Sequence, residues 1–274
     1  MRLPVIRGLI DRRILVNYRV DPEVLARMLP TPFQPKLVDG AGMAGVCLIR
    51  LKRIRPKFIP GFLGISSENT AHRISVEWGL DGRRREGVFI PRRDTSSRLN
   101  SLAGGRVFPG EHHHARFQVN EQDGRYQIIV NSDDCRTHLV VAGHASAEWP
   151  KSSVFASLEE ASRFFERGSL GYSTRSAPGS FDGLELRAYD WQAQTLAVER
   201  LESSFFEDLD LFPPGSARFD CALLMRGIEH EWRERPRLCS ACIDPAAQSV
   251  GIRYESRASS PLTGSPGSRD TPLR

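Results

Sequence analysis

The sequence predicts a mainly β protein whose strands are antiparallel and form a barrel or a sandwich. Segments with alternating apolar and polar residues recur along the chain, and turn signals separate them about every ten residues. Two Asp-Gly pairs, at 81–82 and 123–124, each lie between two such segments, as expected of tight hairpins. Helix signals are few, and the segments that carry them are short.

Period-two alternation, or a run of β-branched and apolar residues, marks each strand segment. In residues 69–78 the alternation places Arg73 and Glu77 on one face and His72 on the other. The predicted strands cover residues 13–20, 42–54, 69–78, 86–91, 112–119, 125–132, 137–149, 170–175, 183–189, 194–202 and 217–232.

Two helices have clear start signals. Asp21 is suited to cap a helix over 23–29, and the proline that follows it fits a first helical turn. Ser157, with a glutamate three positions on, forms a capping box at the start of a helix over 157–167.

Two weaker helical segments complete the prediction. A short helical turn is expected at 203–209. Ser96 and Ser97 are candidates to cap a short helix that ends at the glycine pair 104–105.

We expect residues 1–239 to form a single domain and residues 240–274 to be a disordered tail. The tail is dominated by Ser, Pro, Gly and Arg and has little to bury. No apolar run approaches the roughly 18–20 residues of a membrane span. The N-terminal segment also lacks the apolar stretch of a signal peptide. These features predict a cytoplasmic protein without a membrane partner.

The chain is basic, with a net charge of +5, and all but four of its 38 basic residues are arginine. Arginine suits bidentate recognition of carboxylates and phosphates. No basic stripe with interleaved aromatic residues and no recognition motif is present, so we expect no nucleic-acid partner. The five cysteines include one CxxC pair, Cys239 and Cys242, which lacks the second ligand pair of a zinc site.

The most informative segment is 92–114, which combines arginines, an aspartate, a glycine pair and three consecutive histidines. Loops that carry so much charge and backbone freedom are common at functional sites. Arg92, Arg93 and Arg98 are candidates for holding an anionic substrate, because a guanidinium group binds a carboxylate bidentately. The alternative is that Asp94 pairs with Arg92 or Arg98 in a salt-bridged loop.

Five long segments, 13–30, 35–56, 61–78, 87–117 and 221–232, carry a family resemblance. They resemble the YqjF/DUF2071 family of uncharacterised bacterial proteins, which is grouped with the acetoacetate decarboxylase-like superfamily. The resemblance implies an acetoacetate decarboxylase-like antiparallel β-barrel or cone with the active site inside it. It also implies a homo-oligomer, since the true decarboxylases form one.

The superfamily's catalytic motif differs in this chain. Acetoacetate decarboxylases carry a G-R-E-x-x-G-F-P-K-K segment whose first lysine forms a Schiff base with the β-keto acid. An alignment without gaps places Gly105 and Arg106 on the first two positions, and His113 and His114 on the two lysines. An imidazole cannot form the imine that this chemistry requires. The resemblance therefore implies an inherited scaffold without Schiff-base decarboxylation.

The alignment favours His113 facing the barrel interior, where a near-neutral imidazole suits acid–base catalysis. Glu77 is the second catalytic candidate if its strand face points inward, and forms a surface ion pair if it points outward. His114 joins the arginines as a candidate for binding substrate.

Metal binding is the alternative use of the histidine run. His112 and His114 share one face of a strand and would need Glu77, Glu111 or His72 as a third ligand. Otherwise we expect neither a metal nor a cofactor.

The sequence thus predicts a protein that binds a small anionic organic molecule, an oxo acid, inside the barrel. Two uses of that site stay open: histidine-based lyase or isomerase chemistry, and ligand binding without catalysis. A third hypothesis is a protein-interaction function that uses the apolar loop 58–64.

Overall fold

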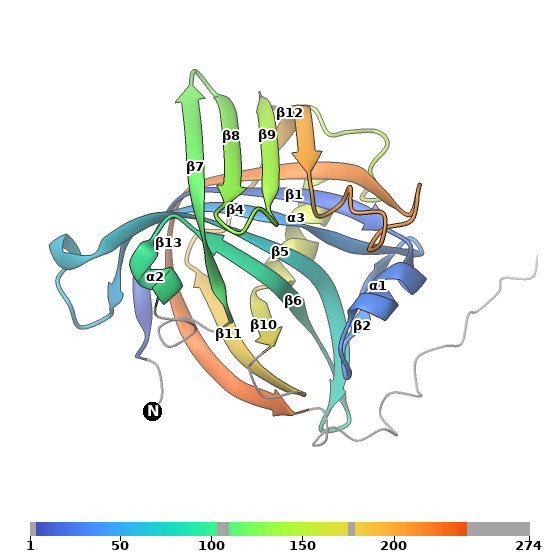
Figure 1. Ribbon diagram of the computed structural model, residues 1–274, viewed down its shortest axis with the longest axis horizontal. Coiled ribbons are helices and arrows are strands. Elements are labelled where there is room, and N and C mark those ends of the chain that lie inside the picture. Colours follow the sequence, from blue (N-terminus) through green and yellow to red (C-terminus); the bar gives the residue numbers. More distant parts are fainter. Residues whose placement is uncertain (1–3, 103–109, 175–178, 240–274) are drawn as a thin grey trace, which may run out of the picture.

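The computed structural model describes residues 4–102, 110–174 and 179–239 (Figure 1). They form one 13-stranded, mostly antiparallel sheet, which confirms the predicted mainly β fold class. The predicted tail, residues 240–274, lies outside the described residues. The strands are β1 (Ile6–Val20), β2 (Gln34–Pro35), β3 (Leu37–Val38), β4 (Ala41–Pro56), β5 (Ile65–Leu80), β6 (Arg83–Thr95), β7 (His112–Gln122), β8 (Arg125–Ser132), β9 (His138–Ser146), β10 (Leu170–Thr174), β11 (Ser180–Ala188), β12 (Gln194–Ser203) and β13 (Ala217–Cys239).

Three α-helices and one 3-10 turn connect the strands. They are α1 (Pro22–Met28), η1 (Gly61–Leu63), α2 (Arg98–Leu102) and α3 (Leu158–Arg167). Asp21 caps α1 by accepting a 2.8 Å hydrogen bond from the Glu23 amide, as predicted. Ser157 caps α3 by accepting from the Glu160 amide at 3.3 Å, also as predicted. These caps are local interactions, which explains why the sequence reveals them.

The sheet closes on itself in two ways. Strands β13, β1, β4, β5 and β6 pair in that order and are shared by both closures. One closure runs from β6 through β10 and β11 back to β13. The other runs from β6 through β7, β8, β9 and β12 back to β13. In Figure 1, β7, β8, β9 and β12 stand above the shared strands, and β10 and β11 lie below them.

Strand alternation sends neighbouring side chains into two different cores. In β1, Ile14 and Val16 belong to one buried cluster and Leu15 belongs to the other. The Leu15 cluster also includes Phe155 and Phe165, which come from the segment around α3. The second cluster and α3 therefore lie on the same side of the shared strands, where the candidate site is found.

Two local predictions were wrong. Residues 92–95 belong to β6, not to a loop, because they pair with β5 on one side and with β7 on the other. Ser96, expected to cap a helix, instead accepts a hydrogen bond from the Glu68 amide at 3.0 Å. In both cases a contact with a distant part of the chain overrides a local signal. The short helical turn expected at 203–209 is present directly after β12, where the Glu207 amide donates to the Ser203 carbonyl at 2.9 Å.

Candidate functional site

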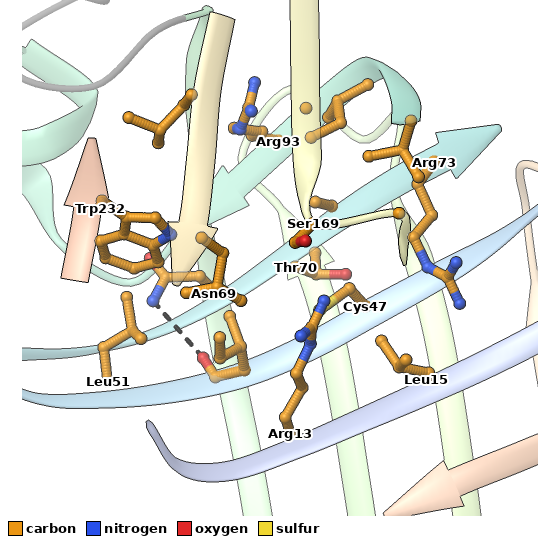
Figure 2. A pocket seen from close by; sticks show the side chains of 18 of the residues that line it. Arg13, Leu15, Cys47, Leu51, Asn69, Thr70, Arg73, Arg93, Ser169 and Trp232 are labelled. Carbon is orange, nitrogen blue, oxygen red and sulfur yellow. Dashed lines mark hydrogen bonds between the residues drawn. The ribbon is translucent and has the colours of Figure 1, made fainter. Parts of the chain in front are cut away.

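A cavity of about 150 Å³ lies between the shared strands, β10, β11 and the C-terminal end of α3 (Figure 2). Its walls are mainly apolar, which is typical of pockets for small organic molecules. The apolar lining consists of Leu15, Ile49, Leu51, Ala71, Val88, Ile90, Phe165, Leu184, Leu186 and Trp232. The polar lining consists of Arg13, Asn69, Thr70, Arg73, Arg93, Asp94, His112 and Ser169, and the Asp94 carboxylate is already bonded to Arg92 and Thr137.

One row of paired residues crosses the cavity wall from β1 to β7. Leu15 pairs with Cys47, Cys47 with Ala71, Ala71 with Arg93, and Arg93 with His112. Paired residues on neighbouring strands project from the same side of a sheet. This register therefore brings a thiol, a guanidinium group and an imidazole to one surface.

Three arginines from three strands line the cavity: Arg13, Arg73 and Arg93. Figure 2 shows Arg13 with its guanidinium group next to Cys47, to whose sulfur its Nε donates at 3.4 Å. Arg73 donates to the Asn17 side-chain oxygen, and Arg93 donates to the Ser173 hydroxyl. No carboxylate of the described chain forms an ion pair with any of the three.

Aromatic rings hold two of these guanidinium groups in place. Arg13 lies over the Trp191 ring at 5.1 Å, and Arg73 lies over the Phe165 ring at 4.7 Å. Such contacts stabilise a cation and orient its planar face. They do not replace an anionic partner, because the N–H groups at the edge of each guanidinium still need acceptors.

Burial makes these charges costly. Arg73 is only 6% exposed, and burial lowers its pKa to about 10; burial likewise lowers the pKa of Arg93 to about 10. Both groups therefore stay protonated at neutral pH. The Nε of Arg73 and one terminal nitrogen of Arg13 are buried without a hydrogen-bond partner among the described residues. A buried cation without a counter-ion is unfavourable, so the cavity is electrostatically suited to an anion.

His112 lines the same cavity. Its Nδ1 lies 3.1 Å from the Gly110 carbonyl oxygen, which can only accept, so Nδ1 carries the proton and Nε2 the lone pair. Burial, and then the positive charge of Arg93, lowers the pKa of His112 to about 4. The imidazole is therefore neutral at physiological pH and can accept a proton.

Of the three arginines predicted from the 92–114 segment, the structure places only Arg93 in the cavity. Arg92 is paired with Asp94 at 2.7 Å and with Asp134 at 2.8 Å, which is the salt-bridged alternative. This pairing holds the pKa of Asp134 well below its usual range. Arg98 is exposed on α2 and does not line the cavity.

His113 faces a second and more polar pocket instead of the main cavity. That pocket, of about 200 Å³, adjoins the first through Ile90 and Arg93 and is also lined by Arg92 and Glu111. The structure therefore differs from the expectation that His113 faces the barrel interior. Arg93 pairs with His112, which places the His112 side chain on the cavity side of β7 and the neighbouring His113 side chain on the other side.

The remaining predicted residues lie apart from the cavity. Glu77 accepts two hydrogen bonds from Arg84, which is the surface ion-pair alternative. His114 bonds to Asp133 at 2.7 Å. Residues 103–109, which include Gly105 and Arg106 of the motif comparison, lie outside the described residues.

The four lysines also lie elsewhere, and none lines the main cavity. Lys36 pairs with Glu86, Lys52 with Asp11 and Lys57 with Glu231, while Lys151 is exposed. Across residues 4–102, 110–174 and 179–239, no three His, Cys, Asp or Glu side chains are grouped to hold a metal ion. His112 and His114 therefore lack a third ligand in that part of the chain.

The sequence analysis missed Arg13, Arg73 and Cys47 as members of a site. Arg13 and Arg73 occupy strand positions that face a core, and a charged residue at such a position is itself a signal. The alternation of residues 13–20 and 69–78 contains that signal. The sequence does not show that Arg13, Arg73 and Cys47 converge, because their convergence depends on how β1, β4 and β5 pair.

The large apolar side chains of the predicted interaction loop are exposed, with Phe58 at 76% and Phe62 at 84%. In the part of the chain that the structure describes, no helix has the length and hydropathy needed to cross a bilayer.

Three histidines with lowered pKa values predict a loss of stability in mild acid. Burial lowers the pKa of His72 to about 3 and that of His230 and His112 to about 4. In the unfolded chain these groups titrate near pH 6.5. Their contribution to the free energy of unfolding is therefore complete above that pH and declines as the pH falls toward about 4. Each histidine that is neutral in the folded protein and protonated in the unfolded chain changes the free energy of unfolding by about 1.4 kcal/mol per pH unit in this window.

Urea unfolding at pH 7.5, 6.0 and 5.0 measures this pH dependence of the free energy of unfolding. We expect His72→Leu to reduce the pH dependence and the exposed control His138→Leu to retain it. Equal slopes in both variants would contradict the assignment.

Comparisons with known proteins agree with this architecture. The fold is that of acetoacetate decarboxylase-like proteins. Acetoacetate decarboxylase from Legionella pneumophila superimposes with a TM-score of 0.57 at 12% identity, over 86% of this chain and 88% of that one. An acetoacetate decarboxylase-like enzyme from Sphingomonas wittichii RW1 gives 0.55 at 12% identity, over 87% and 93%. The enduracididine biosynthesis enzyme MppR, complexed with pyruvate, gives 0.54 at 12% identity, over 88% and 91%.

The chain belongs to the DUF2071 family, described as an uncharacterized conserved protein, whose profile matches residues 10–227. This confirms the family predicted from the sequence. No curated protein matches the chain. At the identities above, the structural likeness establishes the fold alone.

Proposed function

We propose that the protein binds a small organic acid, and specifically an oxo acid, in the cavity lined by Arg13, Arg73 and Arg93. The observation that carries the proposal is the convergence of three guanidinium groups, one buried and two half-buried, without a carboxylate partner among the described residues. A carboxylate would accept their hydrogen bonds bidentately, while the apolar walls would contact the carbon chain. The pyruvate bound by MppR supports the choice of an oxo acid.

The same cavity offers one group for proton transfer. His112 is a neutral imidazole with its lone pair on Nε2, and it lies next to Arg93 in the strand register. It is therefore our candidate for acid–base chemistry on a bound oxo acid. His113 stays a candidate in the adjoining pocket, where the neighbouring Arg92 is already paired with two aspartates.

Matched pairs of acids and their amides test the binding. We expect pyruvate and malonate to raise the melting temperature by several degrees at concentrations about 100-fold above Kd. Pyruvamide and malonamide should give no rise, because they have the same shape without the charge. Malonate should bind more tightly than a monocarboxylate, since its two charges offset more of the buried positive charge. Equal shifts from acids and amides would refute an anion site.

A further inference from the structure

Cys47 is the cavity's one thiol, and the acid-binding site does not by itself require it. Its sulfur accepts the hydrogen bond from Arg13 Nε at 3.4 Å. It pairs with Ala71, whose methyl group leaves open space between Cys47 and Arg93 in the row across the wall. Cys47 is 7% exposed and lines the cavity.

Three positive charges surround this sulfur. Arg13 touches it, and Arg73 and Arg93 are close enough for the electrostatic interaction with Cys47 to bear on their own pKa values. Guanidinium groups beside a sulfur attract an anionic ligand to it and stabilise the negative charge that develops on the carbonyl oxygen during nucleophilic attack. The Nε of Arg73, which is buried and has no hydrogen-bond partner among the described residues, is a second sign that a ligand belongs in the cavity that Cys47 lines.

We propose that Cys47 is a nucleophile that captures the bound oxo acid covalently and reversibly. This inference rests on the proposed function, because the guanidinium groups that hold the carboxylate also hold the keto carbon near the sulfur. A bond forms between Sγ and the keto carbon, and the carbonyl π bond breaks. The thiol proton ends on the former carbonyl oxygen, so the product is a hemithioketal and no oxidant or reductant takes part. A cysteine nucleophile of this kind needs no lysine.

Alkylation of the native protein tests the reactivity of Cys47 against an internal reference. Iodoacetate is anionic and iodoacetamide is neutral, and both transfer their carbon to sulfur with loss of iodide. An ordinary exposed thiolate, such as that of Cys135, reacts faster with the neutral reagent because it repels the anionic one. At Cys47 the surrounding charges should reverse this order.

We expect the ratio of iodoacetate to iodoacetamide rates, from peptide mapping by mass spectrometry, to be at least about tenfold higher at Cys47 than at Cys135. Arg93→Gln should lower the ratio at Cys47, and Arg98→Gln, an exposed arginine outside the cavity, should leave it unchanged. An unreactive Cys47, or the same ratio at both cysteines, would overturn the proposal.

Carbon NMR with pyruvate labelled at C2 tests the covalent step. The native protein should convert part of the ketone signal into a tetrahedral carbon signal distinct from that of the free hydrate. Cys47→Ser should lose this signal and keep the pyruvate-induced rise in melting temperature. If both proteins are stabilised and neither forms the adduct, only the covalent step fails. If pyruvate stabilises neither protein, the proposed binding function fails as well.

Discussion

Replacing Arg93 by glutamine should weaken the binding of small organic acids by about 2–4 kcal/mol, or roughly 30- to 900-fold in Kd. The substitution removes a buried, charged donor that lies between Cys47 and His112 in the row across the cavity. Glutamine keeps a hydrogen-bonding group near Ser173 but supplies no charge. Calorimetric titration with malonate measures the loss.

The same substitution should stabilise the ligand-free protein. Arg93 is a cation without a carboxylate partner in the described chain, and burial lowers its pKa, so its removal relieves the cost of desolvating the charge. We therefore expect a higher melting temperature and a smaller response to malonate in Arg93→Gln. The control Arg98→Gln should change neither value. Loss of binding in Arg98→Gln, with normal binding in Arg93→Gln, would contradict the cavity as the site.

Replacing Glu68 by alanine should reduce the free energy of unfolding by about 3–5 kcal/mol. Glu68 is bonded at 2.5 Å to Arg12, which is fully buried, and at 2.5 Å to Arg50. Glu121 pairs with both arginines as well, so the group forms a closed ion-pair network between β1, β4, β5 and β7. Removing one carboxylate leaves a buried positive charge only partly compensated.

Urea unfolding of Glu68→Ala and of a matched surface variant measures this. Glu199 pairs with Arg125 at 2.9 Å, but both side chains are largely exposed. Glu199→Ala should therefore cost less than about 1 kcal/mol. Similar losses in the two variants would show that the buried network contributes no more than a surface pair.

Two neighbouring arginines, Arg12 and Arg13, differ in what compensates their charge. Arg12 and Arg13 are neighbours in β1 and project to opposite faces. Arg12 is surrounded by carboxylates, whereas Arg13 reaches a cavity in which no carboxylate of the described residues pairs with it. Protein carboxylates compensate the first charge, and a bound ligand is the natural partner of the second.

Much of the fold could be predicted from local signals. The Asp-Gly turns adopt positive φ at both residues, at 81–82 and at 123–124, as tight hairpins require. The caps of α1 and α3 likewise depend on residues at most three positions apart. Such interactions are encoded in short stretches of sequence and do not depend on the tertiary arrangement.

The site could be predicted only in part, because it depends on strand register. The sequence drew attention to the segment that contains Arg93 and the histidine run, and β6 and β7 bring these residues side by side. It could not determine which histidine lines the cavity, because one residue of register exchanges His112 and His113. It could not reveal Cys47 beside Arg13 either, because their proximity results from the pairing of β1 with β4.

A crystal structure of the protein grown with pyruvate or malonate tests the central claim most directly. We predict electron density for the acid in the cavity, with its carboxylate against two or more of Arg13, Arg73 and Arg93. Density only in the adjoining pocket beside Arg92 and His113, or an empty cavity at saturating acid, would contradict the account.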